Sequence, residues 1–549
     1  MDNYRTFFIF GLLIVSLLLW EAWQNDYVRP QQQAAQQAAT QVQDGPDMNA
    51  DLPDLPAASS FDSAADMPAL PAGASAISSS ERVRITTDVI DAYIDTQGGD
   101  IRSLALLKHF EEAGATDRPV QFLDDSSSLF FVTQSGLRSD STAPTHHDRF
   151  RAEADSYTLQ EGQDSIKVPL HWQSEDGLQV VKTYTFHRDS YLVDVEYQVI
   201  NNTGERFAAY PYAQLNRTRA GRDSFLLYTY TGPVFSSPGN EYDKVTFDDL
   251  EKNPLRRSAA SGWVAMLQHY FVAAVIPDQS VDEMGFYGNS VGDNNFIAGI
   301  RFPAIAAQSG DTAQTSFQLY LGPKEYPRLQ AAAENLDLTV DFGMLTIISK
   351  PLFIVMEWFY KLTGNWGWSI VLLTLLIKLV FYRLSAASYR SMASMRKLTP
   401  KLASLKERYG DDKQKFNQAM MDLYRTEKIN PLGGCLPILV QMPVFLAFYW
   451  VLVESIELRH APFIFWIQDL TAIDPYFILP VLFGLTMWYQ QKLNPMPQDP
   501  AQAMMMKIFP IVFTVFFAFF PSGLVLYWLV NNILSIAQQW HITRKMGAL

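Results

Sequence analysis

One lysine inside a strongly apolar segment is the side chain in this sequence that most clearly invites chemistry. Lys378 stands in the run LLTLLIKLVFY. A lysine within a membrane span costs several kcal/mol unless it faces a wet cavity or reaches the membrane surface. Arg383 follows five residues later, so extension of the Lys378 ammonium to that surface is an open alternative.

Polar residues on other apolar segments favour the cavity. Such residues usually converge inside a helical bundle, where they hold helices together or line a water-filled groove. No carboxylate lies in the inner half of an apolar segment, so a proton relay is disfavoured and a hydrated cavity is predicted. The polar residues that we expect beside Lys378 are Thr374, Gln441, Asn531, Asn532, Ser535 and Gln538.

Enzyme motifs are missing from the sequence. It has no Gly-x-Ser-x-Gly, His-Glu-x-x-His or phosphate-loop spacing, so we expect no catalytic residues and no cofactor. His146, His147 and Asp148 could ligate a metal, but neighbours on an extended chain point to opposite faces. A solvated loop without a metal site is therefore expected there. The single cysteine, Cys435, excludes a disulfide scaffold.

Six apolar segments are candidates for membrane spans, each of which needs about 20 residues of helix. The first, Tyr4–Trp23, ends in bulky aromatic residues, which favours an uncleaved anchor over a secretory signal. Pro521-Ser522-Gly523 separates the last two segments, which are predicted to form a tight helical hairpin. The C-terminal candidates are Trp366–Tyr382, Leu436–Val453, Pro475–Tyr489, Met504–Phe520 and Leu524–Ala537.

The charge distribution orients these spans. The chain carries 43 Lys and Arg against 57 Asp and Glu, which argues against a general nucleic-acid binder. The acidic excess precedes residue 366, because residues 366–549 hold 17 basic and 10 acidic residues. The 384–430 segment carries ten basic residues and the 456–474 segment only one, which places 384–430 in the cytoplasm and 24–365 outside. Six spans with both termini cytoplasmic satisfy every loop.

The sequence predicts an α-helical polytopic membrane protein with a large all-β sandwich domain. Residues 1–24 would form the anchor, and residues 25–80, rich in Gln, Ala, Pro and Ser, a flexible linker. Residues 81–340 alternate apolar and polar residues between turn signals, which indicates antiparallel β structure. An amphipathic helix at 341–363 is expected on the membrane surface, followed by a five-span core at 364–549.

The cytoplasmic 384–430 segment has a helical pattern of its own. Thr399-Pro400 begins a helix that Gly410 ends, and Asp411 or Asp412 caps a second helix running to Lys428. The result is a basic, methionine-containing hairpin. It either touches lipid headgroups or docks an anionic partner, such as ribosomal RNA or a targeting complex.

Three motifs resemble the YidC membrane-protein insertase family. They are Asn430-Pro-Leu-Gly-Gly-Cys435 continuing to Phe445, Gly410-Asp-Asp-Lys-Gln, and Phe520-Pro-Ser-Gly-Leu-Val-Leu-Tyr527-Trp528. The resemblance covers about 200 C-terminal residues, and the anchor, linker and β domain match the Gram-negative branch. It implies a bacterial inner-membrane insertase and chaperone with a periplasmic β-supersandwich.

The resemblance also implies roles for individual residues. Lys378 matches a family arginine that lies in a hydrophilic groove open to cytoplasm and lipid; lysine keeps the charge but loses the planar fork. A client's acidic tail would be drawn to Lys378 while its apolar helix slides along Phe516, Phe519 and Trp528 into lipid. The substrate-contact positions of the family map onto Thr374, Tyr389, Phe445, Phe483, Phe516, Phe519 and Trp528.

The implied partners are nascent membrane proteins, the lipid bilayer and the Sec translocon, beside which the chain acts when it does not act alone. The ribosome and a targeting complex would bind the 384–430 hairpin and the C-terminal tail, and the chain is expected to act as a monomer.

Two other functional classes stay open. A solute transporter is disfavoured because the sequence shows no paired halves. A carbohydrate-binding sensor would use aromatic pairs such as Tyr210 and Tyr212 of the outer domain, which we expect rather in its core.

Overall fold

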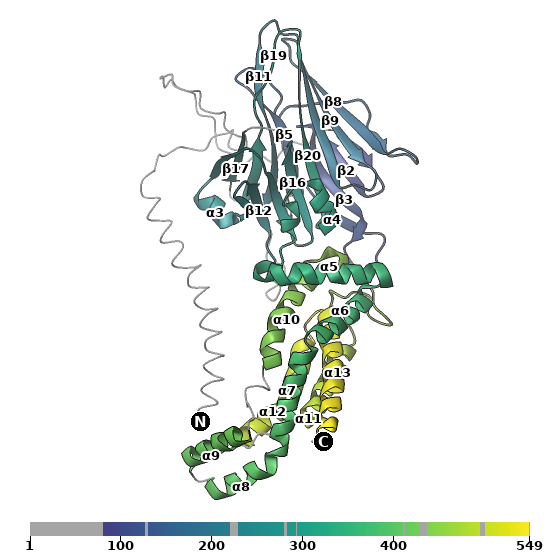
Figure 1. Cartoon of the computed structure of the whole chain (residues 1–549). Helices are drawn as coiled ribbons and strands as arrows, with labels where there is room; N and C mark the ends of the chain where they lie inside the picture. Colours follow the sequence, from purple (N-terminus) through teal and green to yellow (C-terminus); the bar gives the residue numbers. More distant parts are fainter. Residues whose placement is uncertain are drawn as a thin grey trace, which may run out of the picture. The chain divides into compact units, whose positions relative to one another are not determined.

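A computed structural model describes most of the chain after residue 80. The predicted anchor at 1–24 and linker at 25–80 lie outside the described residues, which are 81–126, 130–219, 229–278, 283–292, 294–409, 412–427, 436–494 and 500–547. Within these ranges, strands occupy the first part and helices the last (Figure 1).

The strands make up a β domain between residues 82 and 323. They are β1 (Arg82–Thr86), β2 (Ile90–Asp95), β3 (Asp100–Phe110), β4 (Pro119–Leu123), β5 (Phe131–Arg138), β6 (Arg151–Ala152), β7 (Ser156–Thr158), β8 (Ser165–Gln173), β9 (Leu178–His187), β10 (Leu192–Asn201), β11 (Phe207–Thr218), β12 (Gly232–Ser237), β13 (Asn240–Lys244), β14 (Leu255–Ala259), β15 (Trp263–Gln268), β16 (Phe271–Pro277), β17 (Met284–Val291), β18 (Asn295–Arg301), β19 (Ile305–Ala307) and β20 (Thr312–Pro323).

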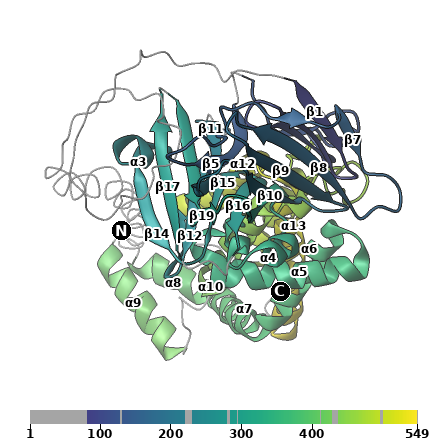
Figure 2. The same cartoon turned by 90° about the horizontal axis from the view of Figure 1, so that it is seen from above.

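These strands pair into three sheets. The largest has nine strands in the order β13-β12-β15-β16-β20-β10-β9-β8-β6, and Figure 2 shows β16, β10, β9 and β8 following one another across it. A five-stranded sheet has the order β4-β3-β2-β1-β7, and a six-stranded sheet the order β14-β17-β18-β11-β19, with β5 also paired to β11. Neighbouring strands run antiparallel except β1 and β7, which are parallel.

Alternation of side chains explains why the nine-stranded sheet has one apolar face. In β10, Val193, Val195 and Tyr197 are buried, whereas the side chains between them are not. The register places Val195 opposite Tyr184 of β9 and Phe317 of β20, so that the three side chains share one face. The β-rich domain predicted from this period is confirmed.

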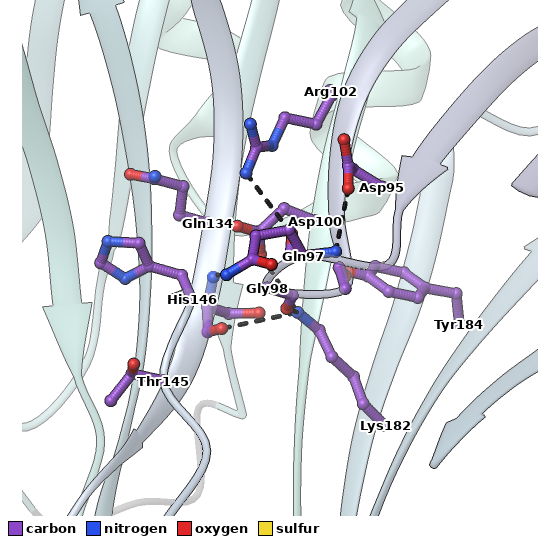
Figure 3. A network of polar contacts seen from close by, with 12 residues as sticks. Asp95, Gln97, Gly98, Asp100, Arg102, Gln134, Thr145, His146, Lys182 and Tyr184 are labelled. Atoms are coloured by element: carbon purple, nitrogen blue, oxygen red, sulfur yellow. Dashed lines mark hydrogen bonds and ion pairs between the residues drawn. The ribbon is translucent and has the colours of Figure 1, made fainter. Parts of the chain in front are cut away.

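A buried ion pair joins the turn between β2 and β3 to the nine-stranded sheet (Figure 3). Lys182 of β9 and Asp100 of β3 are fully buried, and Lys182 Nζ lies 3.3 Å from Asp100 Oδ1. The ammonium also donates to the Gly98 carbonyl oxygen over 3.0 Å. Burial lowers the pKa of Lys182, and the charge of Asp100 opposes that shift. The rings around the ammonium, 5.3 to 5.8 Å away, belong to Phe150, Tyr184 and Tyr197.

Glycine at position 98 makes this pair possible. Gly98 has a φ of +79°, which favours glycine, and it forms the turn with Gly99 that the sequence predicts. A Cβ at Gly98 would lie 2.5 Å from Asp100 Oδ2, so any larger residue would displace the carboxylate.

The solvated loop predicted for residues 146–148 is wrong for its first member. His146 is fully buried, and its Nδ1 lies 2.6 Å from the hydroxyl of Tyr212 on β11. Asp148 fixes the loop by accepting a hydrogen bond from Thr145 N over 2.7 Å. The sequence pattern could not show this, because the partner that makes burial of the imidazole tolerable is 66 residues away.

Helices follow the β domain, with one short helix inside it. The described helices are α3 (Phe247–Lys252), α4 (Tyr326–Ala332), η2 (Leu336–Thr339), η3 (Gly343–Leu345), α5 (Thr346–Thr363), α6 (Trp366–Val380), α7 (Tyr382–Lys397), α8 (Thr399–Tyr409), α9 (Lys413–Thr426), α10 (Leu436–Glu454), η5 (Ile456–Leu458), α11 (Ile478–Leu493), α12 (Pro500–Phe517) and α13 (Ser522–Lys545).

Local signals explain several helix boundaries. Gly364, with a φ of +66°, ends α5, and the Asn365 side chain accepts a hydrogen bond from Trp368 N to cap α6. Asp412 caps α9 in the same way, as the sequence predicts. Helices α8 and α9 pack together, while α7 occupies the first part of the 384–430 segment.

Helix α5 has two unlike faces. It packs against α6 and α10, and its Phe353 and Met356 are buried. On its other face Ile347 is 85% exposed and Trp358 61% exposed. The 341–363 segment therefore contains a helix with one apolar exposed face, which begins at Thr346.

A helix that spans a bilayer must be both long and apolar. Across the ranges that the structure describes, no helix taken singly is both long and apolar enough to span a membrane. Helices α6 and α7 meet the requirement only as a pair, across a bend of 68°.

The last two helices differ from the predicted hairpin. A turn separates α12 from α13 at Pro521, but α12 packs chiefly against α11, and α13 packs against α6, α7 and α11. Gly484 of α11 explains the first contact, because a Cβ there would lie 1.9 Å from Thr514 Oγ1 of α12. Small residues let membrane-type helices approach closely, and the turn signal alone does not say which helix is the neighbour.

We expect Gly484→Ala to destabilise the helical part by about 1–3 kcal/mol, because the added methyl group has no space. The measurement is thermal unfolding of the detergent-solubilised chain, followed by far-ultraviolet circular dichroism. Adding Thr514→Ala removes the hydroxyl in the way and should restore much of the loss. An equal loss with and without Thr514→Ala would contradict this explanation.

A second buried ion pair connects the β domain to α10. Lys324, directly after β20, places its Nζ 3.0 Å from Glu454 Oε2, and the two side chains are 2% and 4% exposed. Beside it, His269 Nε2 lies 2.9 Å from the Val453 carbonyl oxygen. These contacts tie the end of the nine-stranded sheet to the end of one helix.

Candidate functional site

Lys378 lies in the last turn of α6 and is the only charged residue of that helix. Its ammonium donates a 2.7 Å hydrogen bond to Ser535 Oγ on α13. Ser535 in turn donates to the Asn531 carbonyl oxygen over 2.7 Å. The ammonium is therefore held between two helices.

A small cavity opens beside Lys378. Its volume of about 10 Å³ has room for about one water molecule. The lining comes from α6, α7 and α10 and from Phe381 between the first two, so the bend after α6 helps to form the cavity. The lining residues are Ile377, Lys378, Phe381, Leu384, Ser385, Val440 and Gln441.

Further polar pairs extend the site to other helices. Gln441 of α10 donates a 2.6 Å hydrogen bond to Asn531 Oδ1. Asn532 donates over 2.8 Å to Thr486 Oγ1 of α11. The structure thus brings together the sequence-predicted residues of three helices, with Thr486 of α11 as a further partner. They are Lys378 of α6, Gln441 of α10, and Asn531, Asn532 and Ser535 of α13. A polar layer crosses the bundle at this level.

Thr374 does not join that layer through a hydrogen bond. Its hydroxyl donates over 2.7 Å to the Ile370 carbonyl oxygen of its own helix. Threonine commonly makes this bond inside helices, which leaves its hydroxyl satisfied without a partner on another helix. Gln538 likewise bonds elsewhere, to the Tyr382 carbonyl oxygen over 3.1 Å.

An aromatic layer adjoins the polar one. Phe445 and Trp528 have ring centroids 4.9 Å apart, and Phe483 and Phe517 5.1 Å apart. Phe517 also contacts Trp528 at 5.7 Å. On α10, α11 and α13 each aromatic residue precedes or follows a polar one by three or four positions, so the two layers share helix faces. The pairs are Gln441 with Phe445, Phe483 with Thr486, and Trp528 with Asn531.

The remaining predicted contact residues lie around this cluster. Phe516 and Phe519 are 52% and 61% exposed, at the end of α12 and just after it. Tyr389 of α7 is buried and packs with Ala386 and Ile542. Of the predicted aromatic residues, the structure therefore brings together Phe445, Phe483 and Trp528, and Phe516 joins them through Phe517, with ring centroids 5.5 Å apart. Tyr389 meets the polar layer instead, through a side-chain hydrogen bond with Ser535.

Sequence reasoning missed three residues of the site: Ser385, Thr486 and Phe517. Thr486 is a lone polar residue in the apolar part of α11, a signal of the same kind that identified Gln441. Ser385 lies two helical turns after Lys378, but the bend between α6 and α7 decides that it faces the cavity. Phe517 carried no signal, because phenylalanines crowd α12.

Within the described ranges, no group of three or more His, Cys, Asp and Glu side chains could hold a metal ion. The groups that this site offers are one ammonium, amides, hydroxyls and aromatic rings, which suit binding and positioning of a peptide.

Comparisons with known proteins agree along the whole chain. Residues 82–355 match the family model of the YidC periplasmic domain, and residues 358–548 that of the 60Kd inner membrane protein. The membrane protein insertase YidC of Thioalkalivibrio sulfidiphilus is 47% identical over 562 residues, with 100% of this chain and 99% of that protein covered. The one from Methylococcus capsulatus is 48% identical over 551 residues, with the same coverage.

Among solved structures, the chain resembles an active YidC insertase whose first transmembrane domain is resolved. That likeness has a TM-score of 0.41 at 18% identity and covers 84% of this chain and 92% of the other.

Proposed function

The chain belongs to the YidC family of membrane protein insertases, and from this premise we propose that it moves hydrophobic segments of nascent membrane proteins from the cytoplasm into the bilayer beside Lys378. Insertion itself rests on identity of 47–48% with curated insertases over the whole chain. The finer proposal concerns the route that the client segment takes into the bilayer, and it rests on the polar layer and the aromatic layer of the site.

The observation that carries the route is the Lys378–Ser535 hydrogen bond of 2.7 Å inside the bundle. A charge held there can attract an acidic client tail before the tail crosses. Gln441 and Asn531 can then exchange hydrogen bonds with the tail, which lowers the cost of taking its polar groups out of water. The cavity would widen as the client displaces these side chains from one another.

The aromatic layer supports the second half of the route. An apolar client helix that leaves the polar layer meets Phe445 and Trp528 and then the exposed rings of Phe516 and Phe519. Transfer of such a helix into lipid releases hydrophobic free energy. No nucleotide is needed for that step.

We further propose the six-span topology in the bacterial inner membrane, with both termini cytoplasmic and the β domain periplasmic. Ile511 and Val515 of α12 are 66% and 58% exposed, and surfaces of this kind usually face lipid or a partner. The exposed face of α5 would lie on the outer membrane surface. The name of the matched 60Kd inner membrane protein family supports this placement.

The partners proposed are nascent membrane proteins, the Sec translocon, and the ribosome with its targeting complex, and the chain would act as a monomer. The α8–α9 hairpin supports the ribosomal contact because Lys401, Lys406 and Arg408 of α8 are exposed. Basic side chains on a short hairpin suit the phosphates of ribosomal RNA.

Site-specific photocrosslinking tests the route. A photoreactive amino acid replaces Phe516, Trp528 or, as control, Ile347 on the exposed face of α5, and a ribosome-stalled membrane protein is presented. We expect crosslinks from Phe516 and Trp528 and none from Ile347. Equal yields from the three positions would contradict the proposed route.

A further inference from the structure

The segment between α10 and α11 has an unusual surface. Residues 461–477 contain no lysine, arginine or glutamate. Their two acids are turned inward, because Asp474 is 1% exposed and the Asp469 side chain 14% exposed. Five large apolar side chains point outward instead, those of Ile464, Phe465, Ile473, Tyr476 and Phe477. We call residues 461–477 the aromatic loop.

Hydrogen bonds within the aromatic loop and to α13 fix its conformation. The Asp474 carboxylate accepts hydrogen bonds from Trp466 Nε1 over 3.0 Å, from Tyr476 N over 3.1 Å and from Leu479 N over 2.7 Å. The start of α13 holds it from the other side, because Ser522 N donates to the Ala472 carbonyl oxygen over 2.7 Å.

Strain accompanies the exposure of its rings. Phe465 and Phe477 both have a φ of +55°, in the left-handed region that phenylalanine rarely adopts. Their side chains are 82% and 48% exposed. Because both rings are exposed, their packing within the protein does not offset the cost of the strained backbone. The rings therefore have a surface to meet outside the molecule.

Continuity with neighbouring elements identifies that surface. Phe463 of the aromatic loop contacts Trp368 of α6, with ring centroids 5.6 Å apart, and Trp368 is 47% exposed. On α5, which packs against α6, Trp358 is 61% exposed. Tryptophan and tyrosine gather where a bilayer meets water, because their rings suit the headgroup level. A protein partner of the ordinary kind would instead meet a rim that carries charges.

We propose that the aromatic loop inserts Phe465, Tyr476 and Phe477 into the boundary between headgroups and acyl chains of the outer leaflet. This rests on the proposed function, since it requires the helical part to be embedded. The loop then forms a second surface anchor beside α5. Together they fix the height of α6, and with it the depth of Lys378 in the bilayer.

Nitroxide accessibility in vesicles tests this. The full chain carrying Cys435→Ser receives one new cysteine, Phe465→Cys or Tyr476→Cys, and is spin-labelled in phosphatidylcholine and phosphatidylglycerol vesicles. Collisions with oxygen and with a water-soluble nickel chelate are compared. Glu112→Cys on the β domain is the water control, and Val515→Cys on α12 is the lipid control. Tyr476→Cys is included because its backbone does not require a positive φ.

We expect the ratio of oxygen to nickel accessibility at 465 and 476 to exceed that at 112 several-fold, as at 515. If 515 is sheltered from nickel but 465 and 476 are not, the inference is overturned and the embedding stands. If 515 is as open to nickel as 112, the embedding and the inference both fail. Shelter of 465 and 476 only after other membrane proteins are added would identify a protein partner and overturn the lipid anchor.

Discussion

Lys378→Glu should lower the insertion of a client with a short acidic translocated tail by about tenfold or more. Two unit charges about 7 Å apart interact by about 2 kcal/mol at an effective dielectric constant near 20, and 1.4 kcal/mol is about a factor of ten. The bundle should survive the change, because the Ser535 hydroxyl can redirect its one proton from the Asn531 carbonyl oxygen to the new carboxylate. Protease protection of the tail in proteoliposomes measures the effect.

Two comparisons separate attraction from a structural role. Lys378→Arg keeps the charge and should insert the same client at close to the normal rate. A client whose tail lacks acidic residues should be far less sensitive to Lys378→Glu than the acidic one. Equal losses for both clients would show that the ammonium holds helices together, as the bond to Ser535 also allows, and does not draw in the tail.

Asp100→Asn should destabilise the β domain by about 3–5 kcal/mol, the usual loss when one partner of a buried pair is removed. Lys182 would keep its place among three rings, with the Gly98 carbonyl oxygen as a neutral partner. For a domain of this size the melting temperature should fall by about 6–20 °C. Scanning calorimetry of the detergent-solubilised chain gives the measurement.

The defect should deepen as pH falls. Burial already lowers the pKa of Lys182, and removal of Asp100 takes away the charge that opposes this. A lysine whose pKa is lower in the folded than in the unfolded state contributes a loss of stability that grows as pH falls below about 10.5. Glu112→Gln, in the exposed pair with Arg118, is the matched control and should change stability by about 0.5 kcal/mol at most. Similar losses for both variants would contradict the buried-pair explanation.

Periodic features were predictable from sequence because they depend on neighbours along the chain. The alternation of apolar and polar residues in β10 predicts a strand with one buried face, and Asp412 predicts the start of a helix. The structure contains both. The convergence of Lys378, Gln441 and Ser535 was predictable for a related reason. Polar residues in apolar helices are stable only where they find other polar groups, which is usually inside the bundle. Their convergence could therefore be predicted without knowing the connecting loops.

Features that depend on distant partners were not predictable. Burial of His146 depends on its hydrogen bond with Tyr212, and the sequence around neither residue indicates the other as its partner. The packing of α12 against α11 depends on Gly484 and Thr514. The Thr514 side chain occupies the space that a Cβ at position 484 would need. Thr374 shows the converse, since its polarity is satisfied by its own helix and carries no information about other spans.

The Lys324–Glu454 contact sets a condition on any shortened version of this protein. Excising the β domain would leave the Glu454 carboxylate at the end of α10 with its counter-charge gone, in surroundings that now keep it 4% exposed. Excision would also remove β-domain residues that now pack at this end of α10, so a chain reduced to its helices would present a newly unpaired carboxylate there. The two halves match separate family models, yet the Lys324–Glu454 pair takes one residue from each and joins them energetically.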